Sequence, residues 1–138
     1  MPTSRFVDNG NGTVTDKLTG LIWLKNADCF GLLNWADAIS LANGLANGQC
    51  GLKDGSRVGQ WRLPESEELS SLINNQQRDS SDWLNLQGFS KVQSDLYWSS
   101  TGSDVSSNIA MCADMHRGGV FKSGTNFSYH VWPVRGGE

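Results

Sequence analysis

The chain has 138 residues and a formal net charge of -3, with three cysteines and six tryptophans. This length suits one domain with a single hydrophobic core, and the absence of a basic run argues against nucleic acid as a partner. No run of about 18 apolar residues occurs, so we expect no membrane span.

The tryptophans are spread along the whole sequence. Large aromatic side chains dominate the buried area of small domains, so this spread predicts one core fed by every segment and one domain over residues 1–138. Residues 1–5 contain no apolar core of a signal peptide. We therefore expect the protein to act where it is made, unless a leader or a larger parent protein has been removed.

The N-terminal part is expected to form a hairpin followed by a short strand. Residues 5–8 and 13–16 are rich in β-formers, and two Asn-Gly steps separate them. Such a step between β-formers is the strongest short-range hairpin signal. After the turn at Thr19 and Gly20, residues 21–24 (LIWL) are typical of a short apolar strand.

The same turn offers oxygen ligands in Asp8, Asn11 and Asp16. The spacing differs from that of a calcium-binding loop, because Gly10 occupies the third position and Thr19 the twelfth. We favour a turn over a calcium site and expect no bound metal.

Two helices are predicted in the middle of the chain. Asn34 can cap the first, whose apolar residues recur on one face until the stop signals at residues 43–44 and 47–48. The second is expected near residues 65–73, after the short strand at 61–64. Residues 74–95 read as polar loop with isolated apolar anchors.

Cys29 and Cys50 flank the first predicted helix, a placement that a disulfide could close. Closing this loop would contribute about 3 kcal/mol. The alternative is two buried thiols in a reducing cytosol. No Cys-x-x-Cys pair or Cys/His cluster occurs, so a zinc site is not expected.

The last third of the sequence is bounded by two aromatic and β-branched segments, residues 97–100 and 131–137. Between residues 99 and 130, 15 of 32 residues are Ser, Thr, Asn or Gly. This composition is typical of exposed loops and strand edges rather than of a core. We interpret the segment as two rigid strands that hold an exposed surface.

Residues 109–116 alternate between apolar and small or polar side chains, which predicts a half-buried strand. The odd positions would face the core. The outer face would present Cys112, Asp114 and His116 side by side. Such a face is either a binding surface or an ordinary solvated strand face.

The order of the predicted elements, strands first and last with two helices early, indicates an α+β fold. The terminal strands are expected to meet in one sheet. Matching motifs occur along nearly the whole chain, at residues 8–16 (DNGNGTVTD), 19–23 (TGLIW), 34–38 (NWADA), 61–64 (WRLP), 97–101 (YWSST) and 131–137 (VWPVRGG).

Together these motifs resemble the Lcl C-terminal domain family, which is grouped with C-type-lectin-like folds. The resemblance implies two helices, a twisted and mainly antiparallel sheet and long loops, with Cys29 and Cys50 as a recurring disulfide pair. Members end surface proteins and adhesins, and some are implicated in binding sulfated polysaccharides. It also implies an extracellular, cell-surface or virion-associated location. The Glu-Pro-Asn and Trp-Asn-Asp signatures of calcium-dependent lectins do not occur.

The last third also resembles the variable segment of proteins diversified by retroelements, which randomise adenine-containing codons. An AAC codon mutated in this way never yields Met, Trp, Lys, Gln or Glu. Between residues 99 and 130 only Met111, Met115 and Lys122 belong to that set. The alternative is that polar loops generally lack tryptophan, and the nucleotide sequence would separate the two.

An enzyme is not expected. Formylglycine-generating enzymes share the implied fold but need two close cysteines near the carboxyl end, where only Cys112 occurs. Cys112 and His116 would be about 13 Å apart on one strand, too far for proton transfer. The carboxyl groups of Asp104 and Asp114 lack the apolar setting that would raise a pKa.

We therefore predict a non-enzymatic ligand-binding module of the receptor or adhesin type, without a cofactor. Its partner would be an unidentified protein or carbohydrate. The alternative is a structural domain through which copies of a surface protein form a homo-oligomer. Polar loop side chains would supply adaptable hydrogen bonds, and aromatic residues would supply rigid contact area. The predicted recognition residues are Ser103, Asp104, Ser106, Asn108, Cys112, Asp114, His116, Thr125, Asn126, Ser128 and His130.

Overall fold

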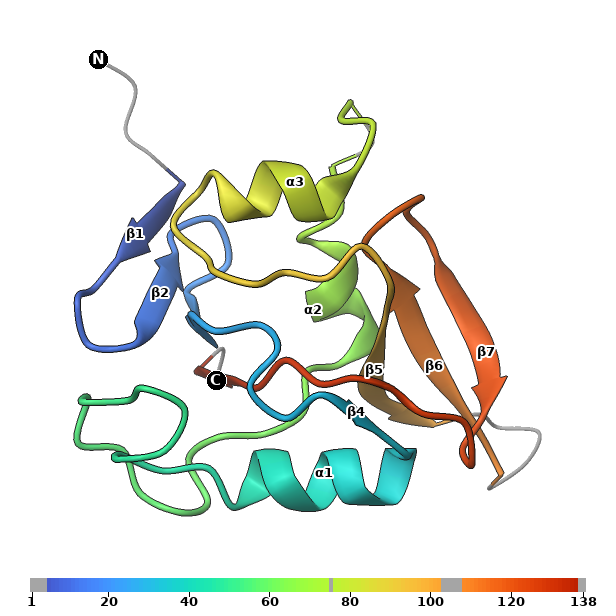
Figure 1. Ribbon diagram of the computed structural model, residues 1–138, viewed down its shortest axis with the longest axis horizontal. Coiled ribbons are helices and arrows are strands. Elements are labelled where there is room, and N and C mark those ends of the chain that lie inside the picture. The colour runs from blue at the N-terminus through green and yellow to red at the C-terminus, as the bar shows by residue number, and fades with distance from the viewer. Residues whose placement is uncertain (1–4, 75, 103–107, 137–138) are drawn as a thin grey trace.

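Two β-sheets and three helices build the part of the chain that the structure, a computed structural model, describes: residues 5–74, 76–102 and 108–136. One sheet has the strand order β1-β2-β3-β9, and the other has the order β4-β8-β5-β6-β7. All three helices pack beside the second sheet or between the two sheets (Figure 1). The predicted α+β class is confirmed. The C-type-lectin-like assignment remains an expectation from the family resemblance.

The first sheet joins the two ends of the chain. Its strands are β1 (Phe6–Asp8), β2 (Thr13–Asp16), β3 (Leu21–Leu24) and β9 (Val134–Gly136), and each pairs with its neighbour in antiparallel fashion. The predicted hairpin, the third strand and the meeting of the terminal strands are confirmed.

The hairpin turn uses Asp8 as a structural group. Its carboxylate accepts the Gly10 N–H at 3.0 Å and pairs with Lys25 Nζ at 2.7 Å. At Gly12 the backbone lies so close to the loop around Gly51 that a Cβ would meet the Gly51 carbonyl oxygen at 2.5 Å. The Asn-Gly steps therefore serve turn geometry and close packing.

The first two helices follow the predicted order. Helix α1 (Trp35–Asn43) begins after Asn34, whose side chain accepts the Asp37 N–H at 2.9 Å, and it ends at Gly44. Helix α2 (Ser66–Ser70) begins after Glu65 and is shorter than predicted. The segment at residues 61–64 contributes only a bridge between Arg62 and Val134.

A third helix, α3 (Ser80–Asn85), lies where the sequence predicted only loop. Asp79 caps it by accepting the Ser81 N–H at 2.9 Å, and Leu84 is buried in the core. Short helices owe their stability to packing more than to intrinsic propensity, so this one gives a weak sequence signal.

The second sheet contains most of the last third of the chain. Its strands are β4 (Leu32–Leu33), β5 (Leu96–Gly102), β6 (Ile109–Asp114), β7 (Val120–Gly124) and β8 (Tyr129–His130). Strands β5 and β8 are parallel, and the other pairs are antiparallel. The strand predicted over residues 109–116 is therefore present and ends at Asp114.

Buried side chains pack on both faces of this sheet. One cluster includes Tyr97, Ala113, Met115 and the helix α2 residue Leu69. The other lies beside α1 and contains Ala38, Ala42, Leu63, Trp98, Ala110, Cys112 and Val131. The six tryptophans all belong to these clusters or pack against them. This arrangement agrees with the prediction of a core fed by every segment.

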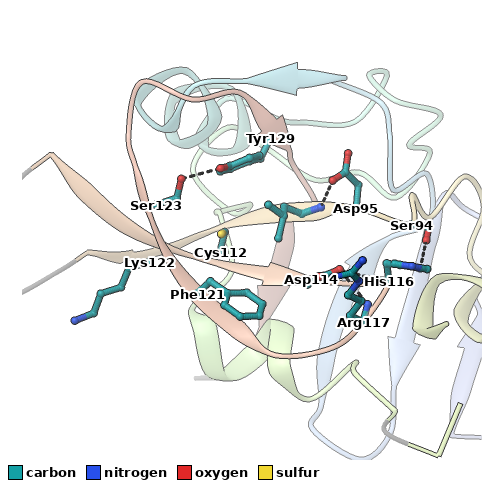
Figure 2. A pocket seen from close by; sticks show the side chains of 11 residues that line it. Ser94, Asp95, Cys112, Asp114, His116, Arg117, Phe121, Lys122, Ser123 and Tyr129 are labelled. Carbon is teal, nitrogen blue, oxygen red and sulfur yellow. Dashed lines mark hydrogen bonds between the residues drawn. The ribbon is translucent and has the colours of Figure 1, made fainter. Parts of the chain in front are cut away.

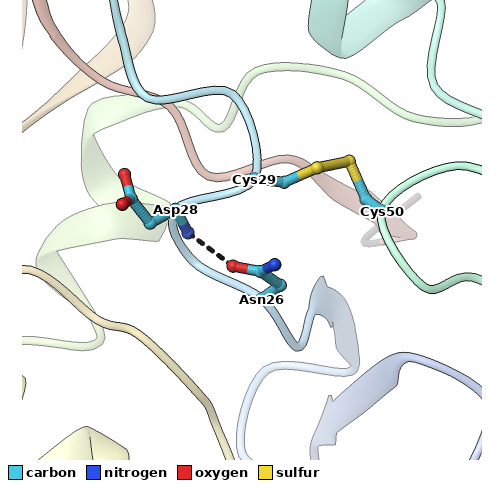
Figure 3. The surroundings of a disulfide bond; sticks show 4 residues. All are labelled: Asn26, Asp28, Cys29 and Cys50. Atoms are coloured by element: carbon cyan, nitrogen blue, oxygen red, sulfur yellow. Dashed lines mark hydrogen bonds between the residues drawn. A yellow bond between two sulfur atoms is a disulfide. The ribbon is translucent and has the colours of Figure 1, made fainter.

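Cys29 and Cys50 form a disulfide, which joins the segments on either side of α1 (Figure 3). The alternative of two free thiols is wrong. Cys112 is the free cysteine and is buried. Within the described residues, no helix combines the length and apolar character that crossing a bilayer requires.

Candidate functional site

A groove of about 400 Å³ opens over strands β5, β6 and β7 (Figure 2). Leu96, Cys112, Phe121 and Tyr129 supply apolar and aromatic surface. The polar lining consists of Ser94, Asp95, Asp114, His116, Arg117, Lys122 and Ser123. Three predicted recognition residues, Cys112, Asp114 and His116, line this one groove.

Strand register explains why these side chains meet. Cys112 lies opposite both Trp98 on β5 and Phe121 on β7, so the three side chains share one face of the sheet. The two glycines Gly118 and Gly119 close the β6–β7 hairpin with positive φ angles of 86° and 102°. The hairpin thus places Phe121 over the face that carries Cys112.

Cys112 is buried, which corrects the prediction of an outward thiol. Cys112 is 1 % exposed and belongs to the buried cluster beside α1 that also contains Ala38 and Ala42. The small residues Ala110 and Cys112 let this helix approach the sheet, so the small side chains mark a covered face rather than a solvated one. Only toward Asp114 and His116 does the face open to solvent.

The Cys112 thiol is suited to packing rather than to chemistry. Burial, together with the nearby Asp114 carboxylate, raises its pKa to about 11. A thiol with such a pKa is almost fully protonated near neutral pH and is a poor nucleophile.

His116 is exposed and anchors one end of the groove. Its Nδ1 lies 2.8 Å from Ser94 Oγ and 2.9 Å from Asp79 Oδ2, and Ser94 Oγ donates to the same carboxylate oxygen at 2.6 Å. A serine triad uses one imidazole nitrogen for the hydroxyl and the other for the carboxylate. Here one nitrogen faces both groups, so Ser94 is not activated as a nucleophile.

The Asp79 carboxylate holds three segments together. Burial acts to raise its pKa, but hydrogen bonds from Ser81, Ser94 and His116 outweigh burial and lower the pKa well below its ordinary value. Asp79 is therefore ionised across the physiological range. It links the start of α3 to the residues that precede β5 and follow β6.

Asp114 and Arg117 shape the turn beside the groove. Asp114 Oδ1 accepts the backbone N–H groups of His116 at 2.8 Å and Arg117 at 3.1 Å. These bonds fix the turn, and the exposed Arg117 side chain lines the same groove as Phe121 (Figure 2). A guanidinium and an aromatic ring in one groove suit recognition of a ligand that carries both polar and apolar surface.

His130 is also buried, so the prediction that its side chain faces solvent is wrong. Its Nδ1 lies 3.0 Å from Asp28 Oδ1, and its Nε2 lies 3.5 Å from Asp95 Oδ2. His130 pairs with Leu32 on β4 and with Tyr97 on β5, so its strand lies within the sheet and not at the edge. Through Asp95, His130 supports the groove from behind.

The remaining predicted residues occupy the far end of β6 and β7. Asn108, Asn126 and Ser128 are exposed, and Thr125 is half-buried. Phe127 stacks on Tyr129 with a centroid distance of 6.4 Å, and Tyr129 Oη lies 2.8 Å from Ser123 Oγ. This chain of contacts connects the far end to the groove. Ser103, Asp104 and Ser106 lie outside the described residues.

Several groove residues were missed by sequence reasoning: Ser94, Asp95, Leu96, Arg117 and Ser123. The Gly-Gly step at residues 118–119 is a hairpin signal that could have paired Phe121 with Cys112. No local signal could have brought residues 94–96 to the groove, because their position depends on β5 pairing with β6.

Metal ligands do not gather at the groove or elsewhere in residues 5–74, 76–102 and 108–136. No group of three or more His, Cys, Asp or Glu side chains in these ranges could hold a metal ion.

Comparison with known proteins identifies one family. The sequence model of the Lcl C-terminal domain matches residues 12–135, which covers both sheets almost completely. No curated protein matches the chain.

Proposed function

The chain belongs to the Lcl C-terminal domain family, and from this premise we propose that it is a non-enzymatic ligand-binding module. Its recognition surface is the groove over β5–β7 together with the exposed turn between β7 and β8. Membership of this family is consistent with a role as a surface module that binds a ligand.

The observation that carries the proposal is the contrast between a buried frame and an open rim. Trp98 and Cys112, under the groove, are almost completely buried. Phe121, His116 and Arg117, at the rim, are exposed. Substitutions at the rim can therefore change what is bound while the frame keeps its packing.

The side chains of the groove favour binding over chemistry. Cys112 is protonated and buried, and Ser94 lacks a correctly placed base. The formylglycine-type alternative needs a free cysteine pair, whereas Cys29 and Cys50 are joined to each other.

The ligand class that this surface suits is a protein or a carbohydrate. Phe121 and Tyr129 offer flat rings for stacking, and Asp114 and Arg117 offer hydrogen bonds of both polarities. We further propose an extracellular, cell-surface or virion-associated location of the adhesin or receptor type. The disulfide supports this location, because disulfides persist in oxidising compartments.

Diversification by a retroelement is part of the proposal. Of the residues that AAC mutagenesis cannot produce, Met115 is fully buried and belongs to the frame, whereas Lys122 is exposed. A near-copy of the last third of the coding sequence, beside a reverse transcriptase gene and differing at adenines, would support diversification. Differences scattered equally over all bases would contradict it.

A structural role in a homo-oligomer is the second candidate. Phe121 and Phe127 are 50 % and 59 % exposed and lie on neighbouring segments, which is the kind of apolar surface that a sister subunit covers. Light scattering distinguishes this role, because oligomerisation through these rings would be lost in the Phe121→Ala variant.

The test is a screen of a glycan array and a surface-protein array with matched variants. Arg117→Ala and Phe121→Ala change the groove rim, whereas Leu86→Ala removes an apolar side chain that is 84 % exposed and lies outside the groove. We expect the two groove variants to lose the bound ligand and Leu86→Ala to keep it. Equal binding by all three variants would contradict the proposed surface.

A further inference from the structure

Strand β7 is the outer strand of the second sheet, beyond β6 (Figure 1). An edge strand presents backbone N–H and C=O groups that can pair with an added strand. The register with β6 shows which residues of β7 direct their backbone groups toward the open edge. Asp114 N–H donates to the Gly119 carbonyl at 3.0 Å, and Thr125 N–H donates to the Asn108 carbonyl at 2.9 Å.

Residues that exchange backbone hydrogen bonds alternate with residues that do not in an antiparallel pair. Gly119 and Thr125 are bonded to β6, so every second residue between them, Phe121 and Ser123, also directs its backbone groups toward β6. Val120 and Lys122 therefore direct theirs toward the open edge. In the described part of the chain, no backbone bond from another segment reaches Val120 or Lys122.

The side chains at this edge are chemically distinct on the two faces. Phe121 lies on the groove face and is 50 % exposed. Lys122 also borders the groove, but it alternates with Phe121 along the strand, so its side chain lies on the opposite face and points away from the Phe121 ring (Figure 2). Among the described residues, no ion pair includes Lys122.

We propose that β7 accepts an extended acidic segment of a protein partner as an additional strand. The backbone of that segment pairs with Val120 and Lys122. On one face an acidic side chain lies opposite Lys122, and on the other an apolar side chain covers the Phe121 ring. Cross-strand pairs of these kinds are favourable, and main-chain pairing supplies affinity in known strand-addition complexes.

The same charges argue against a second copy of this chain as the occupant. The register that pairs all of Val120–Gly124 with its own copy is centred on Lys122. It would place two ammonium groups opposite each other, and like charges directly opposite are unfavourable. Lysine on an edge strand is a common means of preventing such self-pairing.

This inference rests on the proposed function in that the ligand is a protein. It is tested on the whole chain with three synthetic peptides. One alternates valine and glutamate, the second alternates valine and lysine, and the third is the glutamate peptide with every backbone nitrogen methylated, so that it cannot donate to β7 in either strand direction. The readout is amide hydrogen exchange at each residue of β7, followed by NMR. We expect the glutamate peptide to slow exchange at Val120 and Lys122, and the other two peptides to leave exchange unchanged.

Two variants make the test specific. Lys122→Glu changes an exposed side chain, and we expect it to weaken binding of the glutamate peptide roughly fivefold and to favour the lysine peptide. Val120→Pro removes an edge N–H without removing a bond to β6, and we expect it to abolish protection at Lys122. A native spectrum of each variant establishes that the fold is kept.

An affinity of the glutamate peptide for Lys122→Glu equal to its affinity for wild type would overturn the acidic partner. An absence of protection with every peptide at millimolar concentration would overturn strand addition altogether. Self-association of the wild-type chain with protection of the same amides would assign the edge to a second copy instead. The proposed function fails separately, when Arg117→Ala and Phe121→Ala leave array binding unchanged.

Discussion

Trp132 Nε1 donates a hydrogen bond of 2.8 Å to the carbonyl oxygen of Leu24, across 108 residues of sequence. The Trp132 ring also packs against Trp23 at 5.2 Å, Phe89 at 5.0 Å and Tyr97 at 5.5 Å between centroids. One side chain thus joins the first sheet to the strand that carries the groove. The position of the recognition surface depends on this contact.

Replacing Trp132 should destabilise the protein strongly. Trp132→Ala removes a fully buried ring, and we expect the free energy of unfolding to fall by about 3–5 kcal/mol. Trp132→Phe keeps an aromatic ring but leaves the Leu24 carbonyl without its donor, at a cost of about 1–3 kcal/mol. Urea unfolding measures both values. Leu86→Ala, at an exposed position, should stay within about 0.5 kcal/mol of wild type.

Patterns that depend on neighbouring residues predicted much of the frame. The Asn-Gly steps located the first hairpin, and Asn34 located the start of α1. Helix α3 was missed because its single turn and a half is stabilised by the burial of Leu84 rather than by a repeating apolar face. Burial of this kind depends on the complete tertiary structure and cannot be predicted from the local sequence.

Acid should loosen the contact that Asp79 makes with Ser94 and His116. Because the pKa of Asp79 is lowered in the folded state, its contribution to stability is present above its unfolded pKa, near 3.8. That contribution is lost progressively as the pH falls from about 4, where the carboxylate of the unfolded chain gains a proton, toward the lowered pKa of the folded state. We expect the melting temperature of wild type to fall more steeply between pH 4 and pH 2 than that of Asp79→Asn.

Asp82→Asn is the matched control, because Asp82 is an exposed carboxylate in the same helix. Its melting temperature should follow the wild-type pH dependence. Identical acid slopes in wild type and Asp79→Asn would show that the three-segment contact contributes little to stability.

The predicted recognition residues should separate into two groups in an alanine series. Asn126 and Ser128 are exposed, so we expect their alanine variants to keep the wild-type free energy of unfolding within about 0.5 kcal/mol. His130→Ala removes a buried imidazole together with its contact to the half-buried Asp28 and should cost about 1–3 kcal/mol. Equal stability of all three variants would show that His130 is not structural.

The site was only partly predictable from sequence for a related reason. Period-two alternation correctly placed Cys112, Asp114 and His116 on one face. Alternation gives the parity of a strand but not which element covers each face, and α1 covers the Cys112 end. Burial of His130 depends on strand β8 lying between β4 and β5, a topology that no local pattern specifies.

Reduction of the disulfide should destabilise the frame without unfolding it. Cys29 and Cys50 are separated by 21 residues, and opening a loop of this size removes about 3 kcal/mol in the chain-entropy account. We expect the Cys29→Ser/Cys50→Ser double variant to unfold at a lower urea concentration with native spectra in buffer. A midpoint equal to that of wild type would contradict a stabilising role.

Cys112 should resist thiol reagents in the folded protein. A pKa near 11, against an ordinary value of 9.0, lowers the thiolate fraction at pH 8 by about 100-fold, and burial under the groove hinders access further. Ellman's reagent should therefore modify the native protein at less than about one hundredth of its rate with glutathione. In 6 M guanidinium, as a control, the unfolded protein should react at the glutathione rate.

Because the Cys112 thiol lies under the groove, a ligand bound in the groove should slow the reaction of the native protein further. Native modification at the glutathione rate would mean that the floor of the groove is open to solvent and that the rim alone does not define the recognition surface.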